Sequence, residues 1–251
     1  MFENIKEQIC EECRRVASTG IDYLNQGIIS LFDKDAEVFA VKKRNIVNTN
    51  VSTDDVMILD KKGKILDGKP EELDERFKIH FVLYNVYPYI RSVVQLDSRW
   101  CSIWSQVGGS LPPLSVLHAK YFLGEVVCTE FVFNDDNEID LYYRIGESIV
   151  NALGNRIACQ IQAVFIKNMG AITWGSTSRE AVDNALVLEE DAFRTWQARI
   201  ALNQMYDYMP YELSKKYYFE NSRHIPLDQN IDKVSMDKLE FLWESNGEER
   251  R

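Results

Sequence analysis

Residues 92–109 of the chain read SVVQLDSRWCSIWSQVGG, and this stretch changes its pattern halfway. Residues 92–96 form a short, mainly apolar segment, which is typical of a buried strand. Residues 100–107 then place their aromatic and aliphatic side chains at helical spacing, and Gly108-Gly109 is a common way to end a helix. The stretch therefore predicts a buried strand that leads directly into a helix.

The flanking sequence adds strands and helices around this unit. An N-terminal helix ends before Gly20, and a capping-box pattern at 177–180 opens a long amphipathic helix. Further strands are predicted at 27–32, 37–41, 56–60, 64–66, 126–133 and 163–166, and a further helix, ended by Pro88, at 73–86. We interpret residues 1–220 as one α/β domain, followed by a polar tail, 221–251, with a short helix around 234–243.

Size, composition and charge narrow the classes of function. With 251 residues, 45% hydrophobic and 12% aromatic, the chain has ample material for a packed core. A formal net charge of −10 argues against nucleic acid and against an anionic membrane surface, because both attract clustered Lys and Arg. No apolar run reaches the roughly 18 residues that span a bilayer, and the charged N-terminus is unlike a signal peptide. We therefore expect a cytoplasmic protein.

The cysteines favour the same compartment. An odd, scattered set of five is typical of reduced thiols: Cys10, Cys13, Cys101, Cys128 and Cys159. The spacing Cys10-x-x-Cys13 also occurs in redox and zinc sites, but here it lies in a helical pattern with no second ligand pair nearby. We interpret the pair as helix core, with a redox or zinc site as the alternative.

Three blocks in this order carry a recognisable signature. They are 98–106 after the buried strand, 118–124 with Cys128-Thr129, and 173–175 followed by 180–190. Together they resemble the class II aldolase and adducin-head family, and within it the L-ribulose-5-phosphate 4-epimerases. The resemblance implies a three-layer α/β/α sandwich around a central, mainly antiparallel sheet. It also implies a four-fold symmetric homotetramer with clefts between neighbouring subunits.

The resemblance also implies a metal site, whose residues are replaced here. Active members hold a divalent ion, usually zinc, with three histidines, and the ion polarises the substrate carbonyl. The His-x-His pair corresponds to Gln95 and Asp97, and the third histidine to Met169 before Gly170-Ala171-Ile172-Thr173-Trp174-Gly175. An amide, a carboxylate and a thioether are a poor ligand set for zinc. We therefore expect no metal and no cofactor.

Other functional positions of the family are altered as well. One catalytic acid corresponds to Arg76, and a second, after the retained His118-Ala119, corresponds to Lys120. The phosphate-binding Gly-Asn-x-Ser element reads Gly27-Ile28-Ile29-Ser30 and has lost its amide, and a Ser-Gly pair that also binds phosphate corresponds to Arg44-Asn45. The exchange of two carboxylates for cations disfavours a divalent cation and favours an anion.

Single residues keep alternative interpretations. Each of four residues also has a purely structural interpretation: Arg76 as part of a solvated helix face, Lys120 as a surface lysine, His118 as a structural histidine and Ser98 as a helix cap. The candidate catalytic residues are Lys120, Asp97 and His118. The candidate substrate-binding residues are Arg76, Gln95, Ser98, Arg99, Lys42 and Asn168.

Two hypotheses about function follow. The first is a family member that has lost the zinc-dependent site and is non-catalytic, with a structural or regulatory role. The alternative is a metal-independent enzyme that acts on a sugar or other polar anionic metabolite in the cleft between subunits. The expected partners are a polar or anionic small molecule and further copies of the chain, or a paralogue with which it completes a shared cleft.

Overall fold

The computed structural model describes residues 2–132, 140–201 and 207–221. The tail helix predicted around 234–243, and His224, lie outside the described residues. Within these ranges no helix is long and apolar enough to cross a membrane.

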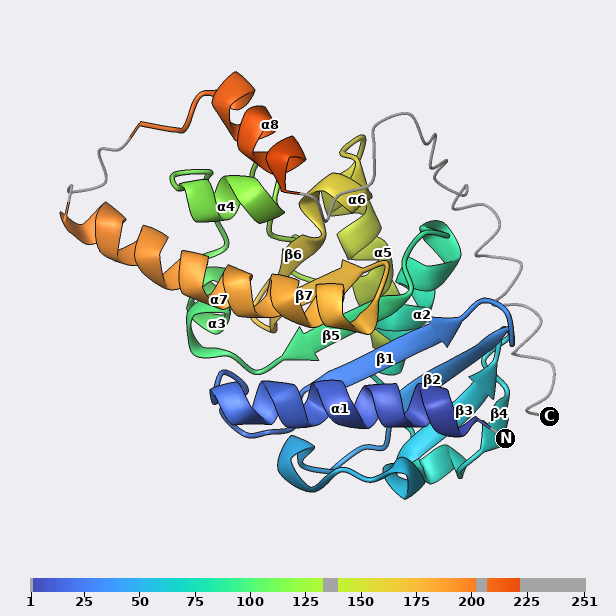
Figure 1. The fold of residues 1–251 in the computed structure, drawn as a ribbon. Coiled ribbons are helices and arrows are strands. Elements are labelled where there is room, and N and C mark those ends of the chain that lie inside the picture. Colours follow the sequence, from blue (N-terminus) through green and yellow to red (C-terminus); the bar gives the residue numbers. More distant parts are fainter. Residues whose placement is uncertain (1, 133–139, 202–206, 222–251) are drawn as a thin grey trace.

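Seven strands form one sheet, in which every neighbouring pair is antiparallel. Their order is β4-β3-β2-β1-β5-β7-β6, and Figure 1 shows the sheet as the middle layer of the molecule. The strands are β1 (Ile28–Asp33), β2 (Val38–Lys42), β3 (Val56–Asp60), β4 (Ile65–Asp67), β5 (Ser92–Leu96), β6 (Ala163–Ile166) and β7 (Gly170–Gly175).

Helices cover both faces of the sheet (Figure 1). One face packs against α1 (Glu3–Thr19) and α7 (Ser178–Ala201), and the other against α2 (Phe77–Val86) and α5 (Leu141–Leu153). The other described helices are α3 (Arg99–Val107), α4 (Val116–Tyr121), α6 (Ala158–Ile161) and α8 (Tyr211–Glu220), with short 3-10 turns at Asn48–Asn50, Thr53–Asp55 and Pro70–Glu72. The structure and the comparisons below confirm the predicted α/β/α sandwich with an antiparallel sheet.

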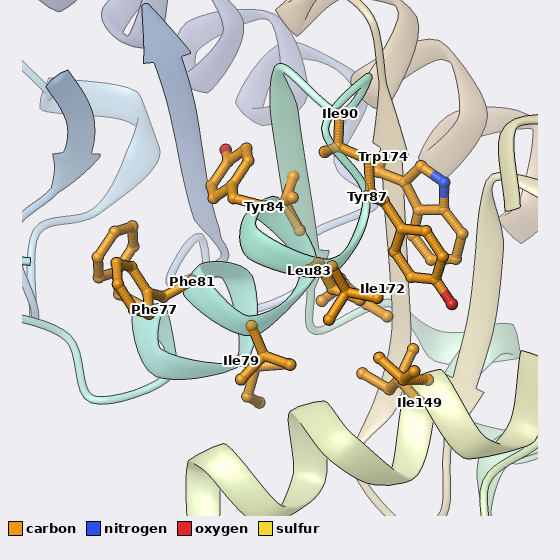
Figure 2. Packing of buried hydrophobic residues seen from close by; sticks show 14 of the residues in the cluster. Phe77, Ile79, Phe81, Leu83, Tyr84, Tyr87, Ile90, Ile149, Ile172 and Trp174 are labelled. Atoms are coloured by element: carbon orange, nitrogen blue, oxygen red, sulfur yellow. The ribbon is translucent and has the colours of Figure 1, made fainter. Parts of the chain in front are cut away.

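Successive side chains along each strand point to opposite faces of the sheet, so each strand contributes to two separate hydrophobic cores. Ile28 and Phe39 point to the α2/α5 side, whereas Ile29 and Ala40, the next residues, point to the α1/α7 side. Figure 2 shows how α2 fills the first core: Phe77, Phe81 and Tyr84 lie toward Phe39 of β2, whereas Ile79 and Leu83 lie toward Ile149 of α5. Strands buried on both faces read as continuous apolar runs, which is why they could be predicted from sequence.

Three predictions about elements need correction. The strand predicted at 126–133 is wrong over its described part, 126–132, because Val126 and Cys128 make only isolated bridges there, to Leu111 and Phe165. The helix predicted at 73–86 begins at Phe77, because residues 73–76 form a bend and a turn in which the Asp74 carboxylate accepts the N–H of Arg76. Strand β7 was not predicted, although it lies between β5 and β6 in the sheet.

Candidate functional site

The residues that follow the buried strand meet other strand ends at one edge of the sheet. Register pairs Ile28 at the start of β1 with Gln95, and Leu96 with Ala171 near the start of β7. Residues 95–99, the β6–β7 turn and Gly27 therefore lie at the same edge. We call this edge, comprising residues 22–27, 95–99 and 168–170, the junction.

Gln95 and Asp97 differ in their surroundings although they are two residues apart. Val93 belongs to the α2/α5 core, so the Gln95 side chain points to that same face of the sheet. Gln95 is 3% exposed, and its Oε1 has no hydrogen-bond partner among the described residues. Asp97 is exposed, and its backbone N–H donates to Oδ1 of Asp22 at 3.3 Å. The Gln95 side chain is thus enclosed by the protein, whereas Asp97 is accessible to solvent.

The β6–β7 turn brings Asn168 and Met169 to the junction. Asn168 adopts a left-handed conformation (φ 62°), and its backbone N–H donates to the carbonyl of Ser105 in α3. Met169 is 38% exposed, which is unusual for a large apolar side chain. The thioether is therefore accessible at the position where the resemblance places the third histidine.

Ser98 and Arg99 lie at the start of α3, but the group that caps this helix belongs to α7. Ser98 is buried and its side chain makes no cap bond. The carboxylate of Glu189 in α7 instead accepts the backbone N–H groups of Trp100 (3.0 and 3.1 Å) and Cys101 (2.9 Å). A carboxylate at this end also suits the helix dipole. The first turn of α3 is thus already bonded within the protein, and the Arg99 guanidinium lies 4.9 Å from the centre of the Tyr23 ring.

Lys42 and Arg76 are both bonded to groups of the protein itself. Lys42 is 2% exposed, and its Nζ donates to the carbonyl of Ile46 at 2.6 Å. Burial lowers the pKa of Lys42, and the carboxylate of Asp22 is among the charges that oppose this effect. Arg76 binds Asp74 through Nε (3.0 Å) and Nη2 (2.6 Å), and its Nη2 also donates to the carbonyl of Gln26 (2.9 Å). Both cations therefore lie beside the junction.

Asp22, which sequence reasoning missed, links these groups. It is 1% exposed, and its Oδ2 accepts the N–H of Gly27 (2.7 Å) and the amide of Asn48 (2.8 Å). Nothing in the spacing of Asp22 to the recognised blocks pointed to it. A polar residue directly after the helix end at Gly20 is an ordinary loop signal.

His118 and Lys120 lie on α4, which packs mainly against α7 and α8 (Figure 1). His118 is fully buried; its Nε2 donates to the carbonyl of Gly124 (2.6 Å) and its Nδ1 lies 2.7 Å from Oδ2 of Asp191. A carbonyl can only accept a hydrogen bond, so Nε2 carries a proton. Both ring nitrogens are thus occupied, which favours the structural interpretation of His118. Lys120 is exposed, and its carbonyl accepts the amide of Asn221 at 2.7 Å.

Groups that could hold a metal are lacking in the described part of the chain. There, no three His, Cys, Asp or Glu side chains are clustered in a way that could bind an ion. Cys10 and Cys13 are fully buried in α1, and burial raises their pKa to about 11 and about 12. Metal binding and thiol exchange both need the thiolate, which these two environments disfavour.

The sequence of the chain matches a known protein family and known relatives. The sequence profile of the class II aldolase and adducin N-terminal domain matches residues 7–195. The L-ribulose-5-phosphate 4-epimerase UlaF of Salmonella paratyphi B is 27% identical over 211 residues, which are 83% of this chain and 92% of that protein.

Solved structures show the same fold. An L-fuculose 1-phosphate aldolase superimposes with a TM-score of 0.74 at 14% identity, over 87% of this chain and 96% of the other. YgbL of Klebsiella pneumoniae, described as a putative aldolase/epimerase/decarboxylase, gives a TM-score of 0.70 at 18% identity, over 86% and 99%. At these identities the likeness establishes the fold, and the chemistry depends on the residues of the site.

Proposed function

Because the chain belongs to the class II aldolase and adducin family, we propose that it is a member without the zinc-dependent site. It keeps the family's fold and serves a structural or regulatory role instead of breaking carbon–carbon bonds or epimerising sugars. The observation that carries this proposal is the set of side chains at the junction where the resemblance places three imidazoles: Gln95, Asp97 and Met169.

These three side chains do not fit a zinc ion. Zinc sites in proteins use imidazole, thiolate and carboxylate ligands, and thioethers suit softer metals such as Cu(I). Gln95 offers a neutral amide oxygen, Asp97 is the single anionic candidate, and Met169 offers a thioether. We therefore assign no step of a reaction to a metal at this edge.

Metal analysis tests the proposal directly. We expect the full chain, purified with zinc present and then dialysed, to retain far less than one zinc per chain by inductively coupled plasma spectrometry. It should also leave L-ribulose 5-phosphate and L-fuculose 1-phosphate unchanged, the sugars named for its relatives. The matched control is Gln95→His with Asp97→His and Met169→His, which restores three imidazoles and should gain zinc. Near-stoichiometric zinc in the wild type that is lost in Gln95→Ala would overturn the proposal.

The alternative is a metal-independent enzyme that acts on a polar, anionic metabolite, with Lys120, Asp97 and His118 as catalytic candidates. The exposed Lys120 supports it, because a lysine amine can form a Schiff base with a keto sugar. Borohydride reduction in the presence of candidate keto sugars should then attach a sugar to the chain, and Lys120→Ala should abolish the adduct. The same adduct yield in Lys120→Ala would remove Lys120 from the mechanism.

We further propose that the chain works in the cytoplasm as a homotetramer, as the resemblance implies, or in a mixed assembly with a paralogue. Lys120 on α4 would then meet the junction of a neighbouring subunit across the shared cleft. Light scattering after size exclusion measures the mass directly, and co-purification from the native source identifies a paralogue. A monomer at all concentrations would leave Lys120 without a route to that cleft.

A further inference from the structure

We propose that Asp22 is a specificity-determining residue that fills an anion-binding site with the protein's own carboxylate. An external oxyanion, such as a phosphate group, is thereby excluded from the junction. The inference goes beyond the proposed function, because it holds whether or not the chain turns over a substrate.

The hydrogen-bond donors around Asp22 are those expected of an anion site. Its two oxygens accept the backbone N–H groups of Gly27 (2.7 Å) and Asp97 (3.3 Å) and the side-chain amide of Asn48 (2.8 Å). Backbone N–H groups and amides aimed at one point bind oxyanions whether these are external or internal. Asp22 is 1% exposed, so water does not compete for these donors.

The charged groups around Asp22 also favour an anion at its position. Asp22 interacts electrostatically with both Lys42 and Arg76. Asp74 binds Arg76 directly, so the four charged groups balance, two positive and two negative. Removal of Asp22 alone would leave a buried excess of one positive charge, which favours uptake of an anion.

Gly27 shows that the carboxylate takes up the available space. A Cβ atom at Gly27 would lie 2.9 Å from Oδ2 of Asp22, 2.6 Å from Cδ2 of Leu96 and 3.1 Å from the carbonyl of Gln95. The backbone at this point is therefore approached as closely as a residue without a side chain permits. A phosphate oxygen could reach the Gly27 N–H only if the carboxylate were absent.

Inorganic phosphate added to the full chain tests the proposal. We expect Asp22→Ala to gain a phosphate-dependent rise in Tm of roughly 4 °C at 20 mM phosphate over sodium chloride of equal ionic strength, as expected for millimolar affinity. Wild type should show no such rise, and adding Lys42→Met to Asp22→Ala should remove it. The matched control is Asp33→Ala, because Asp33 also accepts two backbone N–H groups, at 2.9 and 3.0 Å, in the exposed β1–β2 turn.

Several outcomes would contradict the proposal. One is a folded Asp22→Ala that ignores phosphate, and another is a wild type that responds to phosphate through Lys42. If Asp22→Ala does not fold, Asp22→Asn decides: it removes the charge and keeps one accepting oxygen, while an NH2 group replaces the other. Its Tm should fall several degrees more than that of Asp33→Asn, and equal falls would show that the charge at Asp22 has no special role. Zinc content, measured separately, bears only on the proposed function.

Discussion

Replacing Asp191 with alanine is expected to lower the free energy of unfolding by about 2–6 kcal/mol, because two buried hydrogen-bond partners lose it, at roughly 1–3 kcal/mol each. Asp191 is 0% exposed; its Oδ1 accepts the hydroxyl of Ser115 (2.9 Å) and its Oδ2 binds Nδ1 of His118 (2.7 Å). The hydroxyl of Ser115 in turn caps α4 by accepting the N–H of His118. The substitution therefore leaves a buried imidazole and a helix cap without their partner.

Urea unfolding of the full chain measures this loss. The matched control is Glu190→Ala, one residue earlier on α7, whose ion pair with Arg194 joins side chains that are 48% and 58% exposed. That change should alter stability by no more than about 0.5 kcal/mol, because solvent screens exposed pairs. If Asp191→Ala cost as little as the control, the buried network would not stabilise α4, and His118 would again be open to a catalytic role.

The parts of the fold that were predictable are those where local pattern and burial agree. Strands β1, β2 and β5 lie in the middle of the sheet and are largely buried on both faces, so their sequences are rich in apolar residues. The end of α1 was equally clear, because Gly20 adopts the left-handed conformation (φ 70°) that ends many helices.

Two errors in the predicted elements have their cause in tertiary context. Residues 126–133 have strand-like composition, but their partners are single residues far away in the sequence, so no ladder forms. Strand β7 contains glycine at both ends and one tryptophan, and its place between β5 and β6 is set by long-range pairing. Side-chain preference alone does not report such pairing.

The residues of the candidate site likewise divide into those that the sequence pointed to and those that it did not. Resemblance found Gln95 and Asp97 because they occupy motif positions, but it gave no weight to Asp22, Glu189 or Asp191. The last two carried a signal, since Glu189 follows Ala185 by four residues and Asp191 follows Leu188 by three, on the buried face of α7. A carboxylate at a core-facing position implies a buried partner. No such periodicity marks Asp22 in its loop.

Acidification is expected to destabilise the protein through His80, a buried histidine outside the junction. His80 is fully buried on α2, its Nδ1 bonds to the hydroxyl of Ser30 (2.8 Å), and its Nε2 has no partner among the described residues. Burial lowers its pKa from 6.5 to about 3, and the charge of Arg76 adds to the effect. The unfolded chain therefore binds the proton more tightly than the folded one.

The sign and size of the effect follow from this difference. The stability contributed by neutral His80 is present above pH 6.5 and is lost progressively as the pH falls toward 3. Since one pKa unit corresponds to about 1.4 kcal/mol, the loss between pH 7 and pH 5 should be about 2 kcal/mol. Other groups also titrate over this range, so the measurement is the difference between wild type and His80→Gln, in which the side chain cannot titrate. Urea unfolding at pH 7, 6 and 5 should show the wild type falling more steeply.

Ser30→Ala separates titration from hydrogen bonding. It removes the hydroxyl that joins His80 to Tyr84 (2.7 Å) but leaves the imidazole buried, so its stability should be lower at every pH while its slope stays that of the wild type. Parallel lines for wild type and His80→Gln would mean that the folded protein admits the proton as readily as the unfolded chain. The core between β1 and α2 would then have to open to water below neutral pH, since a charged imidazole cannot stay there without a partner.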